Sequence, residues 1–299
     1  MARTYISSVL ETIGFDAAAM GDCARAADAT LGRVARVDRG IATVLTEDGP
    51  VRAGFGADLL CRIAADATAA PCTGDWAVLR AWPDHRVTVD HLLPRRTAVV
   101  RAVASERSQG QVLCVNAEYA AVVVSLHPAP QLTRVERLVA LAWQSGAQPI
   151  VVLTKADLVP DAVHVAEDVA AAAPGVEVVV CSTVTGDGVA RLREIIGTRD
   201  TMALLGPSGH GKSSLVSALA GADVLGSRRI RVDGRGRQTS VRRELVPLPG
   251  GGAVIDTPGL RGIGLVDVDE GMAARKDAPL AAERRRRRPR EPRSTSAPQ

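Results

Sequence analysis

The sequence predicts an α/β domain built on an open parallel sheet, with a small antiparallel β-barrel before it. Two observations predict this fold. Short alternating strands with Gly and Asp turns occupy residues 31–96, and buried apolar strands alternate with amphipathic helices over residues 97–268. Residues 1–30 are Ala-rich and predict a short helix or a loose N-terminal extension. Residues 269–299 hold a run of arginines among Pro and Ser, a composition typical of a disordered tail.

The composition favours a globular protein over a membrane protein or a disulfide-rich one. Of the 299 residues 46% are hydrophobic, and no apolar run reaches the roughly 18 residues of a membrane span. The N-terminus lacks a basic-then-apolar signal pattern. The five cysteines lie far apart without a C-x-x-C pair, so neither disulfides nor a zinc site is indicated. We expect a cytoplasmic monomer with reduced thiols and no membrane association.

The net charge of +4 is unevenly distributed along the chain. From Ala273 to Gln299, nine Lys or Arg residues accompany three Asp or Glu residues, a net charge of +6, so the first 272 residues carry −2. The basic balance therefore belongs to the tail. The folded body is not predicted to be a uniformly cationic surface for nucleic acid.

The predicted barrel begins at about Leu31 and ends near Pro94. Turns rich in Gly and Asp at 38–40 and 47–50 separate strands in which apolar and polar residues alternate. The expected strands are Gly32–Val37, Ile41–Thr46, Trp76–Arg80 and Arg86–Leu93. An oligonucleotide-binding barrel (OB-fold) of about five strands fits a segment of this size.

Arginines on this segment permit two interpretations. They could be RNA backbone contacts of a binding module, or they could be solvated side chains of an ordinary barrel. They are Arg33, Arg36, Arg39, Arg52 and Arg80. Trp76 and Trp82 are as compatible with a core position as with base stacking, so the sequence leaves both interpretations open.

From about Thr97 the pattern becomes α/β. Apolar runs predict strands at Tyr119–Leu126, Pro149–Leu153, Val176–Val180, Met202–Leu205 and Gly252–Ile255. The spacing of apolar residues and the flanking breakers predict helices at Gln131–Gln144, Asp161–Ala173, Val189–Ile196 and Ser214–Ala220. Short polar motifs follow the carboxyl ends of the strands, which is typical of ligand sites in open parallel sheets.

The strand Met202–Leu205 leads into a phosphate-binding loop of the pattern G-x-x-x-x-G-K-[ST]. The loop and the start of its helix comprise Gly206, Pro207, Ser208, Gly209, His210, Gly211, Lys212, Ser213 and Ser214. Its glycines allow backbone N–H groups to point at phosphate oxygens, and the helix N-terminus adds a positive dipole end. We expect Lys212 to bridge the β- and γ-phosphates as a catalytic residue, and the Ser213 hydroxyl to bind Mg²⁺.

Two further motifs indicate that the base is guanine. Thr154, Lys155 and Asp157 fit the pattern [NT]-K-x-D, in which one carboxylate accepts both N1–H and the exocyclic amine of guanine. Adenine presents no such pair of donors, so a buried carboxylate would reject it. Ser182 and Thr183 follow the next strand and fit the short motif whose backbone N–H meets guanine O6.

The last motif, Asp256-Thr257-Pro258-Gly259, fits the aspartate turn of GTPases. Asp256 would support Mg²⁺ and the Gly259 N–H would meet the γ-phosphate. In Ras-like GTPases the phosphate loop comes first and the base motifs last, whereas here the base motifs precede the loop. The sequence therefore predicts a circularly permuted P-loop GTPase domain behind the OB barrel.

On these motifs and their order, from about Gly32 to Asp269, the sequence resembles the family of ribosome small-subunit-dependent GTPases known as RsgA or YjeQ. The resemblance implies Mg²⁺-dependent hydrolysis of GTP to GDP, stimulated by the small ribosomal subunit during its late maturation. It also implies rRNA binding through the barrel, and a C-terminal domain that binds one zinc ion.

The chain departs from this family pattern in two places. The family's switch segment reads roughly G-x-G-R-H-T-T, and Gln238 here replaces its catalytic histidine. Glutamine can orient the attacking water but cannot titrate as a histidine does. Thr239 would supply the second hydroxyl on Mg²⁺, with Ser240 as the alternative. After Leu265 there is no cysteine, so we expect no zinc, and the basic tail could touch rRNA, remain solvated or reflect a truncated gene.

Two other functions are compatible with the motifs. The chain could be an RNA-associated protein that binds GTP with little turnover, which the loss of the histidine and of the zinc domain would favour. It could instead be a P-loop enzyme that uses ATP and is unrelated to ribosomes, which Asp157 argues against.

Overall fold

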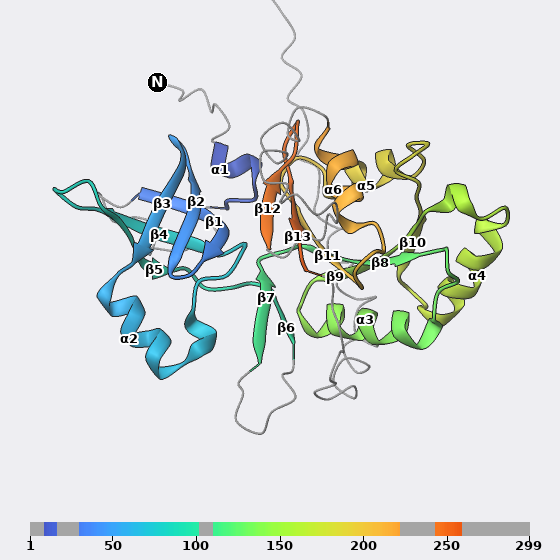
Figure 1. Ribbon diagram of the computed structural model, residues 1–299, viewed down its shortest axis with the longest axis horizontal. Coiled ribbons are helices and arrows are strands. Elements are labelled where there is room, and N and C mark those ends of the chain that lie inside the picture. Colours follow the sequence, from blue (N-terminus) through green and yellow to red (C-terminus); the bar gives the residue numbers. More distant parts are fainter. Residues whose placement is uncertain (1–8, 17–29, 102–109, 222–242, 259–299) are drawn as a thin grey trace, which may run out of the picture.

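The computed structural model describes residues 9–16, 30–101, 110–221 and 243–258 (Figure 1). A barrel forms one end of the molecule and an α/β sheet forms the other, with the β6–β7 hairpin between them. This hairpin, β6 (Ala98–Arg101) and β7 (Gln111–Val115), was not expected from the sequence. The fold class predicted from the motifs is confirmed, and the features below position the site.

The barrel closes in the order β1-β2-β3-β5-β4. Its strands are β1 (Thr30–Asp38), β2 (Ile41–Thr46), β3 (Gly49–Phe55), β4 (Trp76–Ala81) and β5 (Val87–Leu92). Along β2 the side chains alternate between the barrel core and the outside, which is the period that a half-buried strand requires. This order, with a helix between β3 and β4, is that of an OB-fold.

Two parts of the barrel differ from the sequence prediction. Strand β3 was not predicted; it begins at Gly49, inside the predicted turn, because residues 49–54 pair antiparallel with β2. Helix α2 (Ala57–Ala65), followed by the short 3₁₀ helix η2 (Ala67–Ala69), was not predicted. Only Leu59 of α2 is buried, so the apolar stripe that would reveal the helix in the sequence is short.

The second domain contains a six-stranded sheet in the order β10-β9-β8-β11-β13-β12, with β12 antiparallel to the rest. Its strands are β8 (Tyr119–Ser125), β9 (Gln148–Thr154), β10 (Glu177–Val180), β11 (Thr201–Leu205), β12 (Glu244–Pro247) and β13 (Ala253–Asp256). All but β12 were predicted as strands, and each observed end lies within one residue of the predicted one. The parallel pairing places the carboxyl ends of five strands along one edge.

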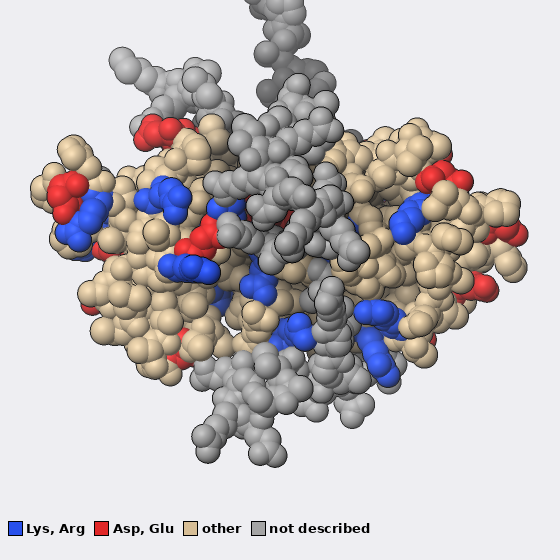
Figure 2. All heavy atoms as spheres, in the orientation of Figure 1, with Lys and Arg blue, Asp and Glu red and all other residues tan. Residues whose placement is uncertain are grey.

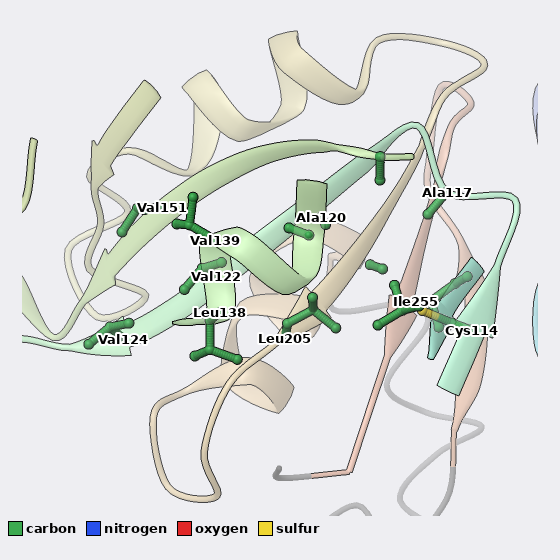
Figure 3. Packing of buried hydrophobic residues seen from close by; sticks show 14 of the residues in the cluster. Cys114, Ala117, Ala120, Val122, Val124, Leu138, Val139, Val151, Leu205 and Ile255 are labelled. Atoms are coloured by element: carbon green, nitrogen blue, oxygen red, sulfur yellow. The ribbon is translucent and has the colours of Figure 1, made fainter. Parts of the chain in front are cut away.

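Helices cover both faces of this sheet. They are α3 (Leu132–Gln144), the 3₁₀ helix η3 (Ala156–Leu158), α4 (Ala162–Ala172), α5 (Val189–Ile196) and α6 (Lys212–Ala220). Side chains of β8 alternate, so that Val122 packs in the α3 and α4 layer and Val123 in the α5 and α6 layer. Figure 3 shows Leu138 and Val139 of α3 among Val122, Val124 and Val151 of the sheet, which belong to the same cluster. This double layer explains why the strands read as continuous apolar runs.

The N-terminal segment contacts both domains, which was not expected from the sequence. At the start of helix α1 (Val9–Thr12), the amides of Val9 and Leu10 donate to the Glu47 carboxylate of the barrel. The Thr12 carbonyl accepts the N–H of Gly252, which precedes β13, at 2.7 Å. Residues 9–16 therefore bridge the barrel and the α/β domain.

Arg33 is not an RNA contact, contrary to one interpretation of the sequence. It is 1% exposed, and its guanidinium donates to Thr201 Oγ1 and to the Asn116 carbonyl, each at 2.7 Å. Burial lowers its pKa to about 10, with the nearby Glu118 acting in the opposite direction. Arg33 therefore fastens the barrel to the start of β11, the strand that leads into the phosphate loop.

The two tryptophans that the sequence left open have different environments. Trp76 is fully buried and packs edge-on against Phe15, so it is a core residue. Trp82, just beyond β4, is 39% exposed, with the Arg80 guanidinium 5.4 Å from its ring centroid. Only Trp82 is therefore available to a partner.

The surface is mixed in charge on the face drawn in Figure 2, where Lys and Arg side chains are interspersed with Asp and Glu. This agrees with the small net charge of the chain ahead of its tail. Within the described parts of the chain, no helix has the length and apolar character needed to cross a bilayer.

Candidate nucleotide-binding site

The motifs that are scattered along the chain meet at the carboxyl edge of the parallel sheet. Strand β9 ends at Thr154, β11 ends at Leu205 and β13 ends at Asp256. Strand β8, which carries none of the predicted motifs, ends between β9 and β11 at Ser125. Ligands in open α/β sheets bind beyond such an edge, so this is the candidate site.

The phosphate loop has the backbone that its glycines were expected to provide. Gly206 has φ +154°, and a Cβ there would lie 2.3 Å from the Val123 carbonyl oxygen, so no other residue fits without a shift. Gly209 and Gly211 have φ values of +83° and +86°, in the left-handed region that favours glycine. Between them the loop turns from β11 into α6, which begins at Lys212 and not at Ser214.

Lys212 points into the hollow of its own loop. Its Nζ donates to the carbonyls of Gly206 and Pro207, both at 2.8 Å, and the residue is 6% exposed. Burial lowers its pKa, and the carboxylate of Asp256 opposes that effect. Of the other loop residues Pro207 is buried, whereas Ser208, Gly209 and Ser214 are exposed.

Ser213 and Asp256 form the candidate Mg²⁺ site. The Ser213 hydroxyl donates to Asp256 Oδ2 at 3.2 Å, and Asp256 is 1% exposed at the end of β13. The neighbouring Thr257 hydroxyl donates to the Leu204 carbonyl at 2.5 Å, which fixes the turn against β11. A hydroxyl and a carboxylate are hard oxygen ligands of the kind that Mg²⁺ takes together with phosphate oxygens, so these residues fit the ion.

No cluster of three His, Cys, Asp or Glu side chains suited to a metal occurs among the residues that the structure describes. This is compatible with Mg²⁺, because the predicted site combines one carboxylate and one hydroxyl with phosphate oxygens and water.

The two guanine motifs are joined by their side chains. Asp157 Oδ1 accepts the Ser182 hydroxyl at 2.5 Å, and the Ala156 amide donates to the Cys181 carbonyl at 3.2 Å. Lys155 takes a left-handed conformation with φ +61°, which turns the chain from β9 into η3 and leaves Asp157 exposed at the edge. The role of Ser182 as a partner of this carboxylate was not expected from the sequence.

Ser182 is itself fixed by the loop that follows it. Its hydroxyl accepts the amides of Val184 and Thr185 at 3.2 and 3.3 Å, and its own amide donates to the Asp187 carbonyl at 3.0 Å. The Ser182 amide is therefore already bonded within the chain, and Thr183, which is half-buried, is left as the candidate for the predicted backbone contact with guanine O6.

The guanine side and the phosphate side of the site are directly bonded. The Thr154 hydroxyl donates to the His210 carbonyl at 2.8 Å, and the Ser125 amide donates to His210 Nδ1 at 3.1 Å. A Cβ on Gly211 would lie 3.4 Å from Thr154 Oγ1, so the loop passes close over the end of β9. Lys155 and Asp157 thus share one site with Lys212.

Three predicted site residues lie outside the described part of the chain. They are Gln238, Thr239 and Gly259. Their assignments stay predictions from the sequence.

The sheet order, the motif order and the attached barrel define the class: a circularly permuted P-loop GTPase fold preceded by an OB-fold barrel. Residues 92–266, more than half of the chain, match the profile of the RsgA GTPase family. The chain belongs to this family.

Curated relatives carry the family name. The small ribosomal subunit biogenesis GTPase RsgA of Streptomyces avermitilis is 50% identical over 245 residues, which cover 81% of this chain and 65% of that protein. RsgA 2 of Lactiplantibacillus plantarum is 36% identical over 249 residues, covering 83% of this chain and 70% of that one. The chain thus spans less than two thirds of the length of the Streptomyces relative.

Two solved structures share the fold. YjeQ from Thermotoga maritima has a TM-score of 0.58 at 19% identity, covering 79% of this chain and 77% of its own. YloQ, described as a circularly permuted GTPase, has a TM-score of 0.53 at 20% identity, covering 88% of this chain and 97% of its own. At these identities the likeness concerns the fold alone.

Proposed function

We propose that this protein binds GTP with Mg²⁺ and hydrolyses it to GDP and phosphate during maturation of the small ribosomal subunit. The relatives are named for that process. The observation that carries the proposal is the bond from Thr154 to His210, because it places a guanine-type loop against a phosphate loop. A protein of this kind would act in the cytoplasm as a monomer.

The phosphate end of the nucleotide is held by charge and by backbone donors. On nucleotide binding, Lys212 exchanges its bonds to the loop carbonyls for the β- and γ-phosphates, which are stronger acceptors. Amides of residues 206 and 208–214 face the same phosphates, and the helix dipole of α6 adds to the attraction. Ser213, Asp256 and Thr239 hold the Mg²⁺, which neutralises charge on the phosphates when bound.

The guanine end is read by one carboxylate. Asp157, oriented by the Ser182 hydroxyl, accepts N1–H and the exocyclic amine, and the Thr183 amide donates to O6. An adenine would face the same carboxylate with an acceptor at N1, so the site rejects ATP. The stem of Lys155 lies over the ring.

Hydrolysis requires a group that orients water against the γ-phosphate. Gln238 supplies it in this chain, where the family pattern has a histidine, and the amide of Gly259 meets the γ-phosphate. Because the permutation makes the aspartate turn the last motif of the domain, the chain that follows Gly259 is the part that would respond to GTP or GDP.

The partner is the small ribosomal subunit with its rRNA, bound through the barrel. Four of the five arginines remain candidates after Arg33 is excluded. Arg39, Arg52 and Arg80 are exposed, and Arg36 is half-buried and paired with Asp38. Trp82 beside Arg80 offers an aromatic surface on which an unpaired base can stack.

A second function is favoured by one observation, the glutamine at position 238. A chain without the family's histidine could bind GTP and RNA but turn GTP over very slowly, acting as a nucleotide-dependent binding protein.

One experiment separates the two functions. GTP hydrolysis is measured with and without purified small ribosomal subunits, with Lys212→Ala as the control that cannot bind nucleotide. Strong stimulation by the subunit supports the enzyme. Tight GTP binding without turnover supports the binding protein, and absence of guanine-nucleotide binding would overturn both.

A further inference from the structure

His210 occupies a variable position of the phosphate loop, yet residues at the ends of two strands outside that loop form hydrogen bonds with it. Its Nδ1 accepts the amide of Ser125 at the end of β8, at 3.1 Å. Its carbonyl accepts the hydroxyl of Thr154 at the end of β9, at 2.8 Å. Side chain and main chain of a single residue thus tie the loop to two strands other than β11, from which the loop emerges.

The hydrogen bond to His210 stabilises the fold because the Ser125 amide is buried. Ser125 is 1% exposed at the end of a buried strand, and a buried N–H without an acceptor is destabilising. The Ser125 hydroxyl serves a different bond, donating to the His127 carbonyl at 2.6 Å. The imidazole of His210 therefore satisfies the backbone at the point where the loop crosses β8.

The imidazole can do this only when Nδ1 carries no proton. A protonated ring has N–H groups on both nitrogens and would place a donor against the Ser125 donor. The surroundings keep the ring neutral: burial and the positive charges of Arg134, Lys155 and Lys212 lower the pKa of His210 to about 4. At neutral pH the ring therefore carries a single proton, and the bond from the Ser125 amide requires the tautomer that has this proton on Nε2.

The bond between the His210 side chain and the Ser125 amide contributes more to fixing the loop because the first residue of the guanine motif, Thr154, is a threonine. The pattern [NT]-K-x-D also admits asparagine, whose amide has two N–H donors, whereas a threonine hydroxyl has one. In this chain the hydroxyl donates to the His210 carbonyl at 2.8 Å, with the Val124 carbonyl as a more distant acceptor at 3.4 Å. A further bond between loop and strand ends must come from elsewhere, and the His210 side chain provides it.

We propose that His210 is a positioning residue that holds the phosphate loop in its nucleotide-ready shape, through the paired bonds to Ser125 and Thr154. This inference rests on the proposed binding of a guanine nucleotide. Since the bonds lie beneath the loop and not at the reacting γ-phosphate, they affect GDP and GTP alike. Loss of the imidazole acceptor leaves the loop less ordered before binding, and the nucleotide must then order it.

The test compares three variants by calorimetric titration with GDP. His210→Ala removes the acceptor, His210→Asn keeps an oxygen acceptor at the position of Nδ1, and His164→Ala is a control on the exposed face of α4. We expect His210→Ala to weaken GDP and GTP binding about tenfold each, which is the size of one buried hydrogen bond. His210→Asn should recover most of that loss, and His164→Ala should match the wild type.

Two results would overturn the proposal. One is unchanged GDP affinity in His210→Ala; the other is an equal loss in His210→Asn, since packing rather than the acceptor would then matter. If His210→Ala does not fold, ¹⁵N spectra of the wild-type imidazole decide the question: an unprotonated Nδ1 supports the bond, and a protonated Nδ1 excludes it. A wild type that binds no guanine nucleotide would refute the proposed function itself, so the two failures are distinguishable.

Discussion

Thr154 donates its hydroxyl to the carbonyl of His210 at 2.8 Å, across a separation of 56 positions in the chain. The contact depends on β9 and β11 each lying beside β8 in a parallel sheet, and not on which of them comes first in the sequence. The permuted order of motifs is therefore compatible with one site. The predictions below test the parts of that site and the residue that fastens the barrel to it.

Base selection depends on Asp157. Asp157→Asn removes the carboxylate that accepts two guanine donors, and it offers an amide N–H that suits the additional carbonyl of xanthine. We expect GTP affinity to fall about 100-fold, the scale of a charged hydrogen bond, while xanthosine triphosphate binds better than it does to the wild type. Titrations with both nucleotides check this; equal losses for the two would exclude the base-reading role.

Phosphate binding depends on Lys212. Lys212→Ala leaves the loop without its cation, and GTP and GDP affinity should fall at least about 100-fold. The matched control is Arg191→Ala on the outer face of α5, whose guanidinium pairs with the exposed Glu177 and Glu194. Fluorescent-nucleotide binding measures both variants, and an affinity close to that of the wild type in Lys212→Ala would remove the phosphate-loop assignment.

The barrel arginines should divide into structural and surface classes. Arg33→Met removes the donor that Arg33 offers to the buried Asn116 carbonyl and Thr201 hydroxyl, so the free energy of unfolding should drop by about 3 kcal/mol. Arg52→Ala, at an exposed site, should change it by less than about 0.5 kcal/mol.

The order of the two variants should be reversed for RNA binding: the substitution that hardly changes stability should be the one that weakens binding. Arg52→Ala should weaken binding of single-stranded RNA, and Arg33→Met, where folded, should leave it unchanged. Urea unfolding and RNA titration measure these effects. A surface role for Arg33 would follow if its substitution weakened RNA binding without loss of stability.

His210 should make stability depend on pH at the acidic side. Its folded pKa is lowered to about 4 from the ordinary 6.5, so between these values the unfolded chain binds a proton that the folded chain does not. The free energy of unfolding should therefore rise as the pH increases through this window, and become constant above about pH 6.5. In His210→Asn that part of the rise should vanish, and identical profiles for the two proteins would contradict the prediction.

Gln238 should govern turnover but not affinity. Gln238→Ala should reduce subunit-stimulated hydrolysis about 100-fold or more while GTP binding stays within about twofold, because the residue orients water rather than the nucleotide. Gln238→His should introduce a titration near the ordinary histidine pKa into the rate profile, which the wild type should lack. Single-turnover assays across pH measure this. A wild-type profile with a histidine-like step would show that another group acts on the water.

The loops of the site were more predictable than their supports. Gly206, Lys212 and Asp256 could be assigned from the sequence because phosphate and metal binding impose a fixed spacing on residues that are close in the chain. The supports lack such spacing. Ser125 belongs to no motif, and Ser182 was expected to act through its backbone, whereas its hydroxyl orients Asp157. Both depend on which strand ends are neighbours, which a local pattern does not contain.

The barrel shows the same division. Alternating residues predicted most of its strands, since burial of one face has a period of two. The same alternation could not separate Arg33 from Arg52, because a buried arginine and an exposed one look alike in sequence. The difference lies in Thr201 and Asn116, which belong to the other domain and accept the bonds of Arg33. Helix α2, of which only Leu59 is buried, was missed because its apolar stripe is short.

By itself the sequence determined the fold class and the permuted order of the motifs, because these follow from short-range spacing and from the periodicity of apolar residues. Only the tertiary structure decided which residues hold the loops together. Thr154 and Ser125 form hydrogen bonds with His210, and Ser182 forms one with Asp157. Arg33 forms hydrogen bonds between the two domains. The physical reason is that a buried donor or acceptor must find its partner in space, and that partner is set by strand order and domain packing rather than by distance along the chain.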